Sequence, residues 1–124
     1  MSKDHPVIAI VDDDQSVCAG VQRLLQSVGF TATTFTSGSA FLASVGADTP
    51  DCVVLDIRMP VMTGFDVQAR LRAMGLALPV IFMSAEDRPG RTAEVSAASG
   101  FAFLQKPFDG QLLVDTITAA IGLR

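Results

Sequence analysis

Five short segments of strand-like sequence, separated by segments with helical periodicity, constrain the fold of this chain most strongly. Four of them are continuously apolar and end at polar or turn residues, a pattern typical of strands buried on both faces of a parallel sheet. The remaining segment, Thr31–Phe35, is rich in threonine and is expected at an edge of the sheet. The four apolar segments are Val7–Val11, Cys52–Leu55, Pro79–Met83 and Phe101–Leu104.

Apolar residues recur at helical spacing in the segments between these strands. Asp14, Ser37 and Asp109 each precede such a stripe and are expected to cap a helix. The segment Pro89–Ser99 has only one large apolar residue, Val95, and predicts the least firmly anchored helix. The other stripes comprise Val17, Val21, Leu24, Leu25 and Val28; Phe41, Leu42 and Val45; Val67, Leu71 and Met74; and Leu113, Ile117, Ala120 and Ile121.

A glycine follows each helical segment, where it can adopt the left-handed conformation that ends a helix. These glycines are Gly29, Gly46, Gly75, Gly100 and Gly122. Strict alternation of strand and helix predicts an α/β fold with right-handed crossovers and helices on both faces of the sheet. Binding sites in such a fold form at the carboxyl ends of the strands.

Composition excludes several classes of protein. The formal net charge of −4 and the pI of about 4.7 argue against direct nucleic-acid binding, which requires a basic face. The apolar segments are far shorter than the roughly 20 residues that cross a membrane. Cys18 and Cys52 are too few for a disulfide framework and are expected to be reduced core residues in a cytoplasmic protein.

Polar residues follow the predicted strands at the points where a site should form. Asp12–Asp14 follow the first strand, Asp56 the third, Ser84 the fourth and Lys106 the fifth. Clustered carboxylates need a cation to remain ionised together, and hard oxygen ligands favour Mg²⁺. The single histidine, His5, lies near the N-terminus and suggests no other metal. One carboxylate could then act as a nucleophile and form an aspartyl phosphate, with the lysine and hydroxyl contacting phosphoryl oxygens.

In order and spacing, these motifs resemble the receiver domain of response regulators in two-component signalling, with local sequence most similar to FixJ-like receivers. The motifs are Val11–Asp14, Val54–Pro60 with Met62–Gly64, Phe82–Ala85 and Phe103–Phe108. The resemblance covers essentially the whole chain. It implies a single receiver domain over residues 1–124, with the CheY-like, flavodoxin-like (βα)5 fold: a doubly wound five-stranded parallel sheet in strand order 2-1-3-4-5.

The resemblance also implies the chemistry of the matching residues. Asp56 corresponds to the phosphoacceptor. Asp12 and Asp13, together with Asp56 and the backbone carbonyl of Arg58, correspond to the ligands of Mg²⁺ (or Mn²⁺). Lys106 corresponds to the residue that pairs with the phosphoryl group, and it completes the catalytic set with Asp56 and the hydroxyl of Ser84.

Further residues correspond to the switch and to the control of phosphoryl lifetime. Ser84 and Phe103 match the switch positions, and Pro107 is expected to follow a cis peptide bond. Arg58 and Glu86 match positions that tune phosphoryl lifetime. An ion pair between them would restrict the access of water or of a phosphodonor.

The implied function is a phosphoryl-accepting switch that catalyses only its own phosphorylation and dephosphorylation. A sensor histidine kinase or a histidine phosphotransfer protein would be the donor. Phosphorylation would change the surface of the fourth helix, fifth strand and fifth helix, and thereby control an output domain, a partner protein or a homodimer. No membrane contact is expected.

Two alternatives remain open from the sequence. One is an interaction module that keeps the fold but works without phosphorylation. The other is a Mg²⁺-dependent phosphohydrolase, because Asp12–Ser16 can be compared with the nucleophile loop of such enzymes. The phosphorylated residue discriminates between the chemistries: Asp12 in a hydrolase and Asp56 in a receiver.

Overall fold

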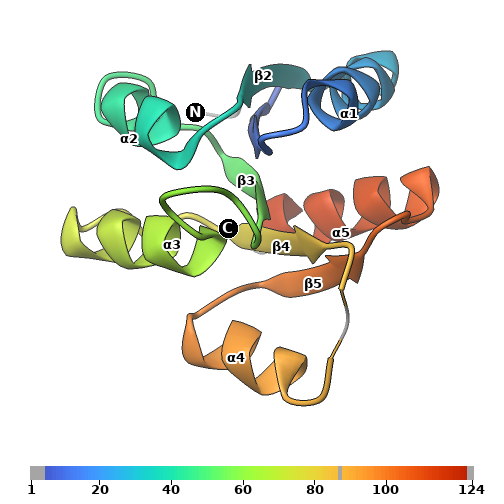
Figure 1. Cartoon of the computed structure of the whole chain (residues 1–124). Coiled ribbons are helices and arrows are strands. Elements are labelled where there is room, and N and C mark those ends of the chain that lie inside the picture. The colour runs from blue at the N-terminus through green and yellow to red at the C-terminus, as the bar shows by residue number, and fades with distance from the viewer. Residues whose placement is uncertain (1–4, 87, 123–124) are drawn as a thin grey trace.

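The computed structural model describes residues 5–86 and 88–122, and these form one parallel sheet covered by helices on both faces (Figure 1). The strands are β1 (Val7–Val11), β2 (Thr31–Phe35), β3 (Cys52–Asp56), β4 (Val80–Ser84) and β5 (Ala102–Gln105), in the order β2-β1-β3-β4-β5. The helices are α1 (Gln15–Ser27), α2 (Gly38–Val45), α3 (Gly64–Ala73), α4 (Arg91–Ala97) and α5 (Gly110–Gly122). The predicted fold class and strand order are confirmed.

Alternation along the strands divides the core into two layers. In β1, Ile8 and Ile10 face the layer that contains α1 and α5. Ala9 and Val11 face the layer that contains α2, α3 and α4. Every residue of β3 and β4 is buried, as the continuously apolar pattern predicts for central strands. Because β1 lies between β2 and β3, the chain crosses to opposite sides of the sheet on leaving β1 and β3.

Three helices, α1, α2 and α5, begin directly after the predicted caps Asp14, Ser37 and Asp109. The Asp14 carboxylate accepts hydrogen bonds from the backbone N–H groups of Ser16 and Val17, and the Ser37 hydroxyl accepts one from Ala40. Each cap satisfies amides that have no partner within the first turn of the helix. The caps therefore fix where the loops that leave β1 and β2 end.

Two apolar residues assigned to helical stripes are not core residues. Val28 and Met74 are 50% and 48% exposed, because each lies just beyond the last residue of its helix. The two cysteines, by contrast, are buried and unlinked, as predicted.

The prediction that a left-handed glycine ends each helix is only partly correct. Gly29 and Gly75 have positive φ angles, but after α4 it is Ser99 that adopts φ 61°. Gly100 is required for a different reason: a Cβ there would lie 2.7 Å from the side chains of Phe82 and Val95. Close packing rather than backbone conformation excludes a side chain at this position.

Within the described residues, 5–86 and 88–122, no helix has both the length and the hydropathy that spanning a bilayer requires.

Gly64 holds the loop after β3 close to the strand, and this generates a stability prediction. A Cβ at position 64 would lie 2.5 Å from the carbonyl oxygen of Asp56 and 3.0 Å from Cα of Ile57. Because displacing these backbone atoms is energetically costly, we expect Gly64→Ala to lower the free energy of unfolding by roughly 1–3 kcal/mol. Gly46→Ala is the matched control, since that Cβ would meet nothing within 4 Å. Urea unfolding measures both, and equal stabilities of the two variants would contradict the packing argument.

Candidate functional site

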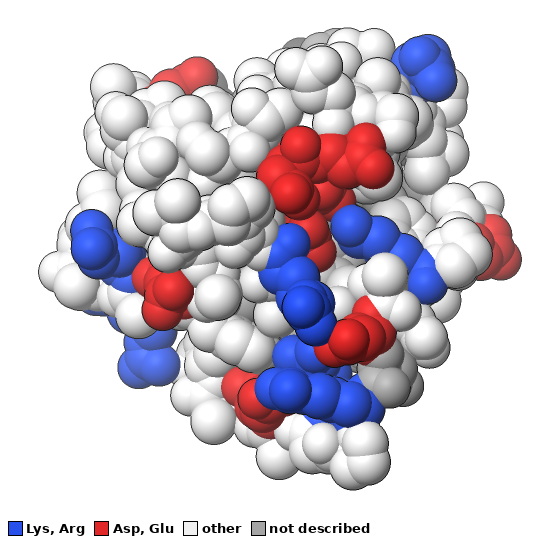
Figure 2. Space-filling view, in the orientation of Figure 1, with Lys and Arg blue, Asp and Glu red and all other residues white. Residues whose placement is uncertain are grey.

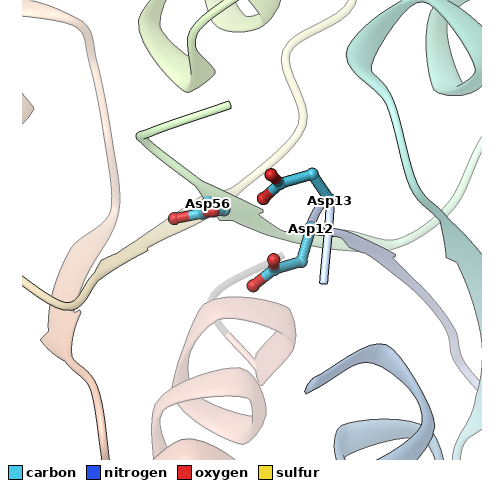
Figure 3. Close-up of side chains that lie close together, drawn as sticks. All are labelled: Asp12, Asp13 and Asp56. Carbon is cyan, nitrogen blue, oxygen red and sulfur yellow. The ribbon is translucent and has the colours of Figure 1, made fainter. Parts of the chain in front are cut away.

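The carboxyl ends of four strands bring the predicted site residues to one edge of the sheet. Asp12 directly follows β1, Asp56 ends β3, Ser84 ends β4 and Lys106 directly follows β5. Asp12, Asp13 and Asp56 lie close together at this edge (Figure 3). Asp12 is fully buried and Asp56 is 4% exposed, whereas Asp13 is exposed to solvent.

The three aspartates form a candidate cation site. One carboxylate oxygen from each can be chosen so that all lie within 4.8 Å of one another, and this is the sole such group among the residues described. Three hard anionic oxygens, with no histidine or cysteine in the group, match the ligand preference of Mg²⁺ rather than zinc. The donor set therefore fits the predicted metal.

Lys106 supplies positive charge to the same cluster. Its Nζ donates a hydrogen bond to Oδ2 of Asp12 at 2.7 Å and lies 3.6 Å from Oδ1 of Asp56. Burial alone would lower the pKa of Lys106, but the hydrogen bond to Asp12 and the charge of Asp56 outweigh it, and the pKa is raised. The lysine is therefore held in its charged form. On this face an acidic patch lies directly beside basic side chains (Figure 2).

The pKa of the Asp56 carboxyl group lies close to neutral pH. Burial raises its pKa, the charge of Asp12 raises it further, and the opposing effect of Lys106 is smaller, so that the pKa is about 6. Burial is thus the main cause of the shift. A bound cation would favour the ionised form of this carboxylate.

Backbone hydrogen bonds hold the strand ends and loops around Asp56. The N–H of Ile57 donates to the carbonyl of Met83, and the N–H of Gly64 donates to the carbonyl of Ile57, both at 2.9 Å. The N–H of Lys106 donates to the carbonyl of Ser84 at 2.8 Å. The site is therefore built on a rigid edge rather than on free loops.

Ser84 is fully buried, and its hydroxyl caps the start of the following loop. Its Oγ accepts a hydrogen bond from the N–H of Glu86 at 3.1 Å. The peptide bond between Lys106 and Pro107 is cis, the geometry that the family resemblance implies.

Arg58 and Glu86 form an ion pair at the same edge of the sheet. Arg58 Nη1 donates to Oε1 of Glu86 at 2.8 Å, which joins the loop after β3 to the loop after β4. The two side chains are 66% and 52% exposed, so the pair adds little to stability.

Phe103 is partly buried against the α2–α3–α4 layer. The guanidinium carbon of Arg91 lies 6.0 Å from the centroid of its ring. Sequence reasoning missed Arg91, which is only 3% exposed. An arginine in a polar helical segment is expected at the surface, so its burial could not be predicted from the sequence.

A family model supports the class that this fold and site define. The model for the response regulator receiver domain matches residues 8–118. The chain therefore belongs to the response regulator receiver domain family of two-component signalling.

Individual relatives agree with that family. The chain is 37% identical over 123 residues to the response regulator protein TodT of Pseudomonas putida, covering 99% of this chain and 54% of TodT. It is 38% identical over 116 residues to the transcriptional regulatory protein TdiR of Thauera aromatica, covering 94% of this chain and 51% of TdiR. The chain thus spans about half the length of these curated relatives.

A solved structure shows the same likeness. The crystal structure of a response regulator receiver protein from Burkholderia phymatum superposes with a TM-score of 0.85 at 45% sequence identity. The match covers 94% of this chain and 95% of that one.

The raised pKa of Asp56 predicts a pH dependence of stability. The folded protein keeps this carboxyl protonated up to about pH 6, whereas the unfolded chain loses the proton near its ordinary value of 3.8. Ionisation of Asp56 therefore lowers the free energy of unfolding as the pH rises from about 4 through about 6. In metal-free buffer, the stability of Asp56→Asn relative to the wild type should increase over this interval and then level off. Thermal unfolding across the pH range measures it, and a constant difference would contradict the shift.

Proposed function

We propose that this receiver accepts a phosphoryl group on Asp56 from the phosphohistidine of a sensor histidine kinase or of a histidine phosphotransfer protein. The observation that carries the proposal is the position of Asp56. Its carboxylate lies at the end of a central strand, grouped with Asp12 and Asp13 and 3.6 Å from the Lys106 ammonium. Family membership supports the same role.

The transfer requires only positioning and charge neutralisation. A carboxylate oxygen of Asp56 attacks phosphorus, the P–N bond to the donor imidazole breaks, and the imidazole leaves with its electron pair and takes up a proton. Lys106 pairs with a phosphoryl oxygen. Asp12, Asp13, Asp56 and the backbone carbonyl of Arg58 would hold Mg²⁺ (or Mn²⁺), which would supply positive charge to neutralise the phosphoryl oxygens. Hydrolysis of the aspartyl phosphate resets Asp56, so the protein catalyses only its own phosphorylation and dephosphorylation.

Asp12 is poorly suited to be the nucleophile that a phosphohydrolase would need. It is fully buried, accepts a hydrogen bond from Lys106 Nζ at 2.7 Å and accepts another from the N–H of Asp14 at 2.9 Å. Both hydrogen bonds occupy oxygen lone pairs that a nucleophilic carboxylate would use to attack phosphorus. These contacts favour Asp56 over Asp12.

The proposed output is a change in the surface formed by α4, β5 and α5. In the phosphorylated state the Ser84 hydroxyl turns toward the phosphoryl group and Phe103 turns inward. Two observations support a movable α4: only Arg91 and Val95 of this helix are buried, and its N-cap, Gly90, makes no side-chain cap hydrogen bond. Few buried contacts make a helix easy to displace.

This surface would act on an output domain, a partner protein or a second copy of the chain. Residues 1–124 would then be one receiver domain working in the cytoplasm, without direct contact to nucleic acid or membrane. The greater length of the curated relatives, and the description of TdiR as a transcriptional regulatory protein, support a role in transcriptional control.

Intact-mass measurement tests the phosphoacceptor assignment. With Mg²⁺ and a small acyl phosphate as donor, we expect the mass of one added phosphoryl group. The addition should be absent in Asp56→Asn and after removal of metal with EDTA. Phosphorylation of Asp56→Asn would contradict the assignment. An unmodified but folded wild type that also fails to accept from a loaded kinase would favour the phosphorylation-independent interaction module.

The pair between Arg58 and Glu86 predicts a slow loss of the phosphoryl group. Because the pair joins the two loops that follow Asp56 and Ser84, its removal should admit water to the aspartyl phosphate. We expect Arg58→Ala to hydrolyse several-fold faster than the wild type, measured by the decay of the phosphorylated mass. Arg70→Ala, which removes an exposed arginine of α3, is the control and should not change the rate. An unchanged rate in Arg58→Ala would show that the pair does not shield the site.

A further inference from the structure

A cavity of about 510 Å³ lies between the loop after β3 and the start of α4. None of the three clustered aspartates is among the residues that line it. Its volume falls in the range of small-molecule sites. The side chains that matter for its chemistry are Phe65, Arg58, Glu86, Arg88, Arg91 and Glu94.

Arg91 is the unusual residue of this cavity. It is 3% exposed, and its Nη1 lies 3.3 Å from Oε1 of Glu94. Its Nε has no hydrogen-bond partner, the sole case among buried side-chain nitrogens and oxygens of the described residues. Burying a guanidinium with one edge unpaired is costly, and a bound acceptor would remove that cost.

The two glutamates that line the cavity already accept hydrogen bonds from its arginines. Glu94 also accepts from Arg88 Nη2 at 2.9 Å, and Glu86 accepts from Arg58 at 2.8 Å. The described lining residues thus carry three guanidinium groups and two carboxylates. A ligand with a single carboxylate suits this lining, because Arg58 and Arg88 are already paired with the two glutamates and a dianion would meet repulsion from them.

We propose that this cavity binds a small organic monocarboxylate. Its carboxylate pairs with the guanidinium of Arg91, whose parallel N–H groups match the geometry of a carboxylate. Because Nε is covered in the present structure, binding requires a rotation of the guanidinium toward the cavity. The hydrocarbon part of the ligand packs on the apolar wall formed by Phe65, Ile57, Met59 and Pro60.

A titration followed by two-dimensional amide NMR tests the proposal on the whole chain, unphosphorylated and free of metal. The probe is cyclohexanecarboxylate, and its neutral isostere cyclohexanecarboxamide is the control ligand. We expect saturable shifts at the cavity residues with about millimolar affinity for the acid and none for the amide. Binding under these conditions does not depend on Asp56 chemistry, so its failure is distinguishable from failure of the proposed function.

Variants then assign the binding to Arg91. Arg91→Met keeps the buried position filled with an apolar chain and should raise the Kd about tenfold or more. Arg91→Lys keeps the positive charge but lacks the parallel N–H groups of the guanidinium, so it should also weaken binding. This variant keeps the test possible if Arg91→Met does not fold. Arg70→Met makes the same chemical change at an exposed position outside the cavity and should bind like the wild type.

Four outcomes would overturn the proposal: no saturable shifts with the acid, equal shifts with the amide, unchanged affinity in a folded Arg91 variant, or tighter binding of inorganic phosphate than of the monocarboxylate.

Discussion

The ion pair between Lys106 and Asp12 is the interaction on which the functional edge of this structure depends. It joins the end of β5, an edge strand, to the end of β1, and β3 and β4 lie between these two strands in the sheet. Without a cation at this point, the carboxylates of Asp12 and Asp56 would repel each other in a buried setting. The lysine makes it possible to assemble acidic groups here before any metal is bound.

That assembly follows from topology rather than from local sequence. In the order β2-β1-β3-β4-β5, the chain leaves β1 and β3 toward opposite faces, which opens a crevice between these strands. Asp12 and Asp56 occupy the two sides of the crevice, and the capped start of α1 and the tight packing of Gly64 keep the two loops short. Burial of the central strands fixes the register, so it also fixes the distance between the carboxylates.

Much of this arrangement is predictable from the sequence, and the reason is periodicity. Apolar runs locate each strand to within one residue, helical stripes show where the helices lie between them, and residues at the carboxyl ends of parallel strands must meet. Asp12, Asp56, Ser84 and Lys106 are therefore brought together as predicted. The left-handed Ser99 and the burial of Arg91 could not be read in this way, because both depend on packing between elements. Steric crowding of Gly100 by Phe82 is likewise invisible to a pattern in one strand or helix.

The burial of Arg91 bears on how α4 is held. This helix contributes Val95 to the core, and its other buried residue is a charged one. Arg91 contacts the ring of Phe103 on one strand and shares Glu94 with Arg88. Apolar contacts resist exchange, whereas ion pairs can change partners when a nearby charge changes. An α4 anchored in part by shared ion pairs is thus sensitive to charge in the adjoining loops. Arg58 and Glu86 bring such charges to the cavity that this helix also lines.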